Sequence, residues 1–277
     1  MTTSIRIVLL SLLVSSLVFG PFGCGESLES LTDRLPAHDD DEIRLAVLGM
    51  QQGSLETALL VALAGEVSMN SGESAMASEA AAKAKDIFSP EDCVDAIATG
   101  PAVSLVFREC AGPFGIVGLD GGANLSFAGE GDSAAVILTA GSLDVNGTSL
   151  ALNVSGLMSE NDENVRSFEL QTSGGGVADG EPITRVGQFM ARLDGDCLVL
   201  NGHWTATRGG TVFPTSFTGF KRCSNPCPTA GTMVLGEAGV DSGERALTLT
   251  FVGTQTVAWV STDQRVGTTT LQCGEAE

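Results

Sequence analysis

The residues of this sequence that could support catalysis are few and widely spaced. The 277-residue chain has two histidines, His38 and His203, and a serine or cysteine nucleophile requires a positioned base. His203, directly before Trp204, is the one plausible base in the part of the chain expected to fold. A strand histidine beside a tryptophan is more often a packed or surface residue, and the sequence has no Gly-x-Ser-x-Gly motif. We therefore predict no catalytic residue and no enzymatic activity.

The sequence also contains few residues at the spacing of a metal or cofactor site. Cys223 and Cys227 lack a second ligand pair at the spacing of zinc sites, and no glycine pair is followed by the Lys-Ser/Thr of a phosphate loop. Asp194-Gly195-Asp196 and residues 159–164 offer clustered oxygen ligands, but neither follows the EF-hand pattern. The sequence thus predicts no metal and no cofactor, with a calcium-stabilised module as an alternative.

Seven cysteines leave one thiol over if the others form disulfides. If Cys24 forms no disulfide, six cysteines remain to pair. Proximity in the sequence favours disulfides between Cys93 and Cys110, between Cys197 and Cys223, and between Cys227 and Cys273. If Gly209-Gly210-Thr211 is a three-residue hairpin loop, Cys197 and Cys223 lie directly opposite one another. Other pairings are possible on the sequence alone. Three bridges are expected because disulfides persist in exported proteins.

The N-terminus has the pattern of a secretory signal. Residues 1–6 form a short polar start with one cation, and residues 7–19 are an almost unbroken apolar run. This run fits a signal peptide and is shorter than the ~20 residues that a membrane span needs. We therefore expect the protein to be exported.

Gly23-Cys24 matches the end of a lipobox, so the first two dozen residues resemble those of bacterial lipoproteins. The resemblance implies that residues 1–23 are removed, that Cys24 is lipidated, and that this lipid anchors the protein to a membrane of the cell envelope. Because Gly25 is not Asp, the resemblance also implies the outer membrane. Ordinary cleavage after Gly20, which would give a secreted or periplasmic soluble protein, is the alternative.

The composition excludes some partners. The net charge is −20, with 34 acidic against 14 basic residues, and so acidic a surface repels nucleic acid and anionic membrane faces. We predict no nucleic-acid partner and membrane association through the N-terminal anchor. An excess of carboxylates is also what a protein adapted to high salt carries, because salt screens the self-repulsion.

The first part of the mature chain is predicted to be helical. Residues 24–42 are interpreted as an acidic tether, in which the acidic run beside His38 is a solvated spacer. Residues 43–100 form the expected helical segment, beginning with one apolar stripe over 43–67. An alanine-rich helix follows, and Ser89-Pro90-Glu91-Asp92 predicts a third, short helix that ends at Gly100.

After Pro101 the apolar period changes to two, which is typical of strands. We expect an antiparallel β meander over 101–227, continued by C-terminal hairpins over 228–277. Asn146-Gly147 predicts a tight hairpin, and residues 173–180 a glycine-rich loop. About a dozen strands without helical crossovers must be antiparallel, and so long a sheet curls or splits into two layers. The predicted fold is α+β, with the helical segment packed on a long curled meander.

Nothing in the sequence identifies a ligand or a protein partner. We expect a secreted, lipid-anchored cell-envelope protein with a non-enzymatic structural or interaction role. The alternative is a carrier that binds a hydrophobic ligand in a partly closed sheet.

Overall fold

The computed structural model describes residues 40–271, except 130–131, 146–147, 162–164, 179–180, 226, 237–245 and 263, together with Cys273. Three sequence predictions lie outside the described residues: the signal segment, the lipidation of Cys24 and the Asn146-Gly147 turn. Most of the expected tether lies outside them as well, but its last three residues belong to a helix that begins at Asp40.

The described strands form one antiparallel sheet of 13 strands, in which every strand pairs with its neighbours in the sequence. This confirms the predicted meander. The strands are β1 (Val94–Thr99), β2 (Ala102–Gly112), β3 (Ile116–Ala128), β4 (Ser133–Val145), β5 (Thr148–Glu160), β6 (Arg166–Ala178), β7 (Glu181–Asp194), β8 (Cys197–Arg208), β9 (Thr211–Arg222), β10 (Ala230–Leu235), β11 (Leu247–Thr250), β12 (Thr256–Ser261) and β13 (Val266–Thr270).

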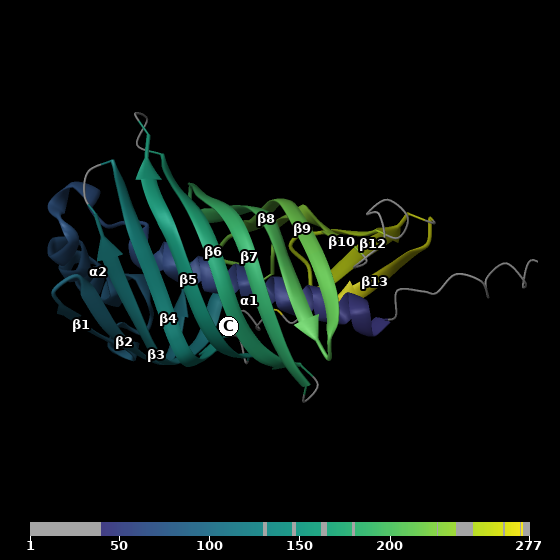
Figure 1. Ribbon diagram of the computed structural model, residues 1–277, viewed down its shortest axis with the longest axis horizontal. Coiled ribbons are helices and arrows are strands. Elements are labelled where there is room, and N and C mark those ends of the chain that lie inside the picture. Colours follow the sequence, from purple (N-terminus) through teal and green to yellow (C-terminus); the bar gives the residue numbers. More distant parts are fainter. Residues whose placement is uncertain are drawn as a thin grey trace, which may run out of the picture. The chain divides into compact units, whose positions relative to one another are not determined.

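The sheet curls around the first helix. Figure 1 shows α1 (Asp40–Ala64) running along the inside of the curled strands, where it contacts β3 to β8. All residues from Gln52 to Gly65 are buried, so the predicted apolar stripe understates the burial of this helix. A helix that is enclosed by other elements is buried on every face. Its side chains belong to a single cluster of buried residues that extends from Ile43 to Cys273.

The helical segment ends earlier than predicted. After α2 (Glu73–Ile87), the expected third helix is a single 3-10 turn, Glu91–Cys93, followed by β1. The helix-start signal is local, whereas Val94, Ala96 and Ala98 alternate with more exposed residues and suit a sheet edge. β1 pairs with β2 over its full length, and these ladder hydrogen bonds outweigh the local preference for a helix.

The predicted glycine-rich loop is also wrong, because Ser173 to Ala178 belong to β6. The reason lies on the inner face of the sheet, where two of these glycines make room for side chains of α1.

The structure contains three disulfides, Cys93–Cys110, Cys197–Cys223 and Cys227–Cys273, with Cα–Cα distances of 5.4, 4.2 and 5.1 Å. These are the pairs that locality favours, but the three-residue loop expected between β8 and β9 is wrong. The loop has two residues, since Arg208 faces Thr211. An irregularity next to Gly202 then shifts the register by one residue, so that Leu198 faces Arg222, and in this register Cys197 and Cys223 are opposite one another, as predicted. The three bridges indicate an oxidising compartment.

In the described part of the chain, no helix combines the length and the apolar character that crossing a membrane requires.

Candidate functional site

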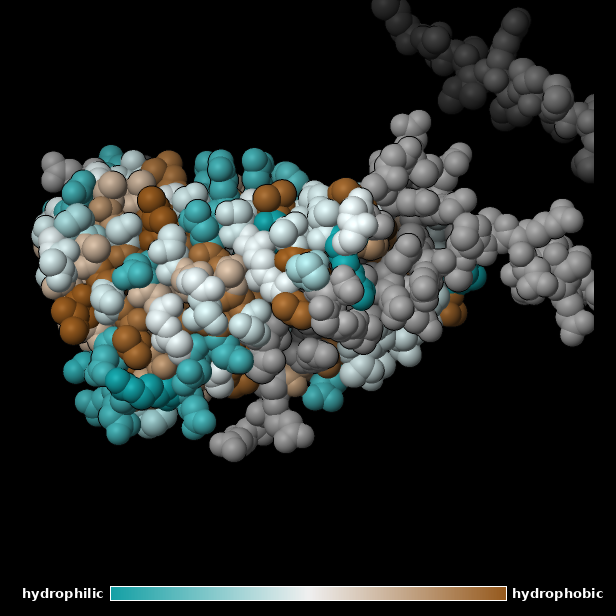
Figure 2. Space-filling view, turned by 60° about the horizontal axis from the view of Figure 1, so that its bottom comes forward, coloured by the Kyte–Doolittle hydropathy of each residue, from teal (hydrophilic) through white to brown (hydrophobic). Residues whose placement is uncertain are grey.

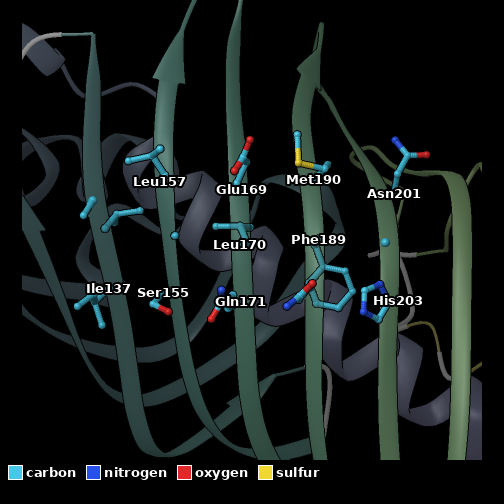
Figure 3. Close-up of a pocket in the computed structure, with 15 residues that line it drawn as sticks. Ile137, Ser155, Leu157, Glu169, Leu170, Gln171, Phe189, Met190, Asn201 and His203 are labelled. Carbon is cyan, nitrogen blue, oxygen red and sulfur yellow. The ribbon is translucent and has the colours of Figure 1, made fainter.

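A shallow depression of about 620 Å³ lies on the outer face of the sheet, across β4 to β8. This face is opposite to α1, which is visible behind the strands in Figure 3. Polar side chains reach the outer face because β5 to β8 alternate: inward Val154, Leu170 and Phe189 are buried, whereas their neighbours Ser155, Gln171 and Gln188 point outward.

The outward side chains form rows across the strands. In one row Ser155 faces Gln171, Gln171 faces Gln188, and Gln188 faces His203. Directly opposite residues lie about 5 Å apart, so the hydroxyl, the two amides and the imidazole form a continuous polar row. Figure 3 shows its labelled members at one level of adjacent strands.

A second row combines apolar and polar side chains: Leu157 faces Glu169, Glu169 faces Met190, and Met190 faces Asn201. Leu157 and Met190 are 44% and 49% exposed. They give the depression apolar contact area beside its hydrogen-bonding groups.

A smaller depression of about 340 Å³ adjoins the first and shares four lining residues with it. It extends the polar surface to Asn153, Ser173 and Thr205. The two depressions therefore form one surface, which we call the outer polar groove. Its shared residues are Ser155, Gln171, Gln188 and His203.

Two inward-facing glycines bring strands of the groove close together. A Cβ on Gly156 would lie 2.6 Å from the Glu169 carbonyl oxygen, and one on Gly202 would lie 2.2 Å from the Gln188 carbonyl oxygen. Only glycine allows so close an approach, so larger residues at these positions would deform the floor of the groove.

The outer polar groove is almost uncharged. Among its described lining residues Glu169 is the only carboxylate and there is no lysine or arginine, although the whole chain carries a net charge of −20. Figure 2 shows one face of the molecule, on which apolar residues are interspersed with pale, weakly polar residues and with groups of strongly hydrophilic ones.

His203, the one base singled out in the sequence, lies in this groove but has no catalytic partner. Its neighbours across the strands are Gln188 and Ser216. No hydrogen bond joins His203 to a serine or a carboxylate of the described residues. A histidine that activates a nucleophile makes such a bond, and His203 does not make one within the described residues.

The inside of the sheet holds a second polar group, the buried pair of Glu56 on α1 and Arg185 on β7. Arg185 donates to the Glu56 carboxylate and to the Gln52 side-chain oxygen. The side chains of Glu56 and Arg185 are 0% and 2% exposed. Burial raises the pKa of Glu56 to about 7 and lowers that of Arg185, because an apolar interior penalises both charged forms.

Gly174 and Gly176 explain how this pair fits inside the sheet. A Cβ on Gly174 would lie 2.8 Å from Oε1 of Glu56 and 2.9 Å from Nη2 of Arg185, and one on Gly176 would lie 3.1 Å from Nε2 of Gln52. The glycine run in β6 thus leaves space for the polar residues of α1.

Two further arginines join the helix to the sheet. Arg222 donates from Nη1 to the Ser54 hydroxyl at 3.2 Å and from Nε to the Phe114 carbonyl at 2.8 Å, and burial lowers its pKa to about 10. Arg166 donates to the Gly65 carbonyl, directly after α1, and pairs with Glu160 at 2.6 Å. A cation near a helix C-terminus is favourable.

Sequence analysis missed these contacts. The available signal was the set of polar residues that interrupts the apolar run of α1, Gln52, Ser54, Glu56 and Thr57, all of which are buried.

Each of the two acidic segments considered for calcium contains a described residue that accepts a hydrogen bond. Asp194 accepts a hydrogen bond from Lys221 at 2.9 Å beside the β7–β8 turn. Asn161 accepts one from the Val165 amide at 2.8 Å, and residues 162–164 lie outside the described part. Among the described residues no group of three or more His, Cys, Asp or Glu could hold a metal ion.

Comparison with protein-family models, with curated proteins and with solved structures gives no match.

Proposed function

We propose that this chain is an exported, lipid-tethered binding protein of the bacterial cell envelope, that it is not an enzyme, and that its ligand docks in the outer polar groove. The groove itself is the observation that supports this function most directly. It combines a row of amides and hydroxyls with exposed apolar side chains, and it has almost no charge.

The chemistry of the groove favours a neutral saccharide chain as the ligand. Amide, hydroxyl and imidazole groups donate and accept hydrogen bonds, as saccharide hydroxyls do, and Leu157 and Met190 offer contact to the apolar faces of sugar rings. An anionic ligand would be repelled by a chain of net charge −20. An uncharged ligand avoids this repulsion.

The packing of α1 does not favour the carrier alternative. A carrier needs apolar space inside the sheet, and the helix occupies that space with residues that are buried from Gln52 to Gly65. Native mass spectrometry that finds co-purified lipid would support the carrier nonetheless.

Binding to an array of neutral oligosaccharides tests the ligand. We expect the unmodified domain to bind at least one neutral saccharide on the array. Replacing both Gln171 and Gln188 by Ala should weaken this binding by roughly tenfold or more, since two hydrogen bonds are removed.

The matched control is Thr184→Ala with Thr207→Ala. These residues face each other on β7 and β8 but do not line the groove, so binding should not change. Absence of binding to every saccharide, or equal losses in both double variants, would contradict the proposed ligand. Release of shortened saccharides during incubation would contradict the non-enzymatic role.

The membrane tether needs a separate experiment because Cys24 lies outside the described residues. We expect Cys24→Ser to move the protein from the outer-membrane fraction to the soluble periplasmic fraction. Unchanged membrane association would contradict lipidation and leave the saccharide test unaffected.

A further inference from the structure

The two edges of the sheet differ in how well they are protected. The strand order runs from β1 to β13, so these two strands are its edges, and Figure 1 shows them at opposite ends of the sheet. An edge strand exposes unpaired backbone groups, and proteins usually protect such strands with charges, proline, bulges or a covering element.

The β1 edge carries several of these protections. α2 packs against β1 and β2, and the Cys93–Cys110 disulfide joins the turn before β1 to β2. On its outer face Asp95 pairs with Arg108 at 2.6 Å, with both side chains more than half exposed. A second chain that approached this edge would meet these charges.

The β13 edge has neither a covering helix nor a charged pair within the described residues, and the Cys227–Cys273 disulfide lies just after it. Its sequence, Val-Gly-Thr-Thr-Thr, contains no charge and no proline, and its residues are good strand formers apart from Gly267. Trp259 on β12 covers Gly267 and faces it in the register, so the ring takes the place of the missing side chain and holds the two strands together.

The outer surface beside this edge is uncharged and includes exposed valines. Val260 and Val266 face each other and are 45% and 76% exposed. β12 and β13 together contain no charged residue. In a chain of net charge −20, two described strands without carboxylates offer a second acidic molecule an approach at low electrostatic cost.

We propose that β13 pairs with β13 of a second copy of this chain, forming an antiparallel, two-fold symmetric dimer. A strand that pairs with its own copy about a two-fold axis makes every contact twice. With the axis near Thr268, each Thr268 faces its counterpart, and each Val266 faces Thr270 of the other copy. Thr–Thr pairs are favourable across antiparallel strands.

We assign a second copy of this chain to this edge because β13 matches itself in length, in its lack of charge and in its backbone hydrogen-bonding groups. The proposal is independent of the outer polar groove, since β4 to β8 take no part in the new contact.

Light scattering coupled to size exclusion tests the dimer, with the exported full-length chain carrying Cys24→Ser so that lipid does not drive association. We expect dimers at micromolar concentration. Their dissociation constant should fall as sodium chloride rises from about 0.05 M to about 0.5 M, because salt screens the repulsion between the copies.

Thr268→Lys should raise the dissociation constant by roughly tenfold or more, since it places like charges opposite each other. Thr268→Glu should do the same, and mixing the two variants should restore dimers. Val266→Lys provides a second disruptive change at the same edge.

Ile97→Lys is the matched control, because Ile97 is 66% exposed on the protected β1 edge, and dimerisation should not change. Circular dichroism establishes that each variant is folded. A protein that stays monomeric at all concentrations and salt levels, dimers that Thr268→Lys leaves intact, or dimers that Ile97→Lys disrupts would each overturn the proposal.

Discussion

The buried pair of Glu56 and Arg185 fixes the position of α1 more than it adds stability. Transferring two charges into an apolar interior costs several kcal/mol, which their attraction offsets only when the geometry is good. Gln52 supplies a further acceptor for Arg185, and Gly174 leaves room for both side chains. The pair therefore selects one axial position of the helix, since a shift by one turn would leave Glu56 without its partner.

Glu56 should make the stability of the protein depend on pH. Burial raises its pKa from 4.5 to about 7, so the folded protein holds a proton that the unfolded chain releases in this range. The unfolding free energy should fall as pH rises from about 4.5 to about 7, by on the order of 1–3 kcal/mol. Glu56→Gln should remove this dependence in urea unfolding at a series of pH values. If the unfolding free energies of the two proteins changed with pH in the same way, this prediction would be wrong.

Removing one partner of the pair should lower the unfolding free energy more than replacing both partners with apolar residues. Arg185→Met leaves the Glu56 carboxyl buried without its partner and should lower the unfolding free energy by about 3–5 kcal/mol. In the double variant Glu56→Leu with Arg185→Met, much of that loss should be recovered. Urea unfolding at constant pH measures both, and a double variant that is less stable than the single one would contradict the interpretation.

At the level of elements, α1 has two glycines in different surroundings. A Cβ on Gly49 would lie 2.2 Å from the Trp204 ring, whereas the nearest atom to a Cβ on Gly53 would be 3.8 Å away, in Phe189. Gly49 therefore lets the ring lie against the helix backbone, and Gly53 has space for a methyl group.

We expect opposite effects when these glycines are replaced by alanine. Gly49→Ala should destabilise the protein by about 1–3 kcal/mol, because the core must shift to accommodate the methyl group. Gly53→Ala should stabilise it by roughly 0.5–1 kcal/mol, the usual gain from alanine within a helix. Thermal unfolding of the two variants provides the comparison, and equal changes in melting temperature would show that Trp204 does not limit the space at Gly49.

Much of the fold is predictable from the sequence, because hairpins depend on local patterns. The alternation after Pro101 predicts the meander, and the apolar residues of 43–67 predict α1. The sequence does not reveal why β6 contains glycine, because that reason is the side chain of Glu56, more than 100 residues earlier. A glycine run predicts a turn when only its neighbours are considered.

The candidate site was predictable only in part. Of the groove residues the sequence singles out His203, whereas the alignment of Gln171, Gln188 and His203 in one row depends on the register of successive hairpins. A shift of one residue moves each side chain to the opposite face, and the shift next to Gly202 shows that loop length alone does not define the register.

For the molecule as a whole, charge should dominate the response to salt. With a net charge of −20, surface carboxylates repel one another in dilute buffer, and screening relieves this repulsion. The melting temperature should rise by several degrees between about 0.05 M and about 0.5 M sodium chloride. Glycerol at equal osmolality is the control, and a melting temperature that does not change with salt would contradict adaptation to a saline habitat.

The enclosure of α1 also determines the order of events in folding. The helix is synthesised before any strand, but its partners Arg185 and Arg222 lie 129 residues after Glu56 and 168 residues after Ser54. Each strand finds a neighbour as soon as the next one emerges, whereas the helix must wait for contacts that are distant in the chain, which form slowly. Until β9 has paired, the apolar surface of α1 is exposed to association with other unfolded chains. A chaperone that shields this helix would therefore be needed most while the middle strands are still unpaired.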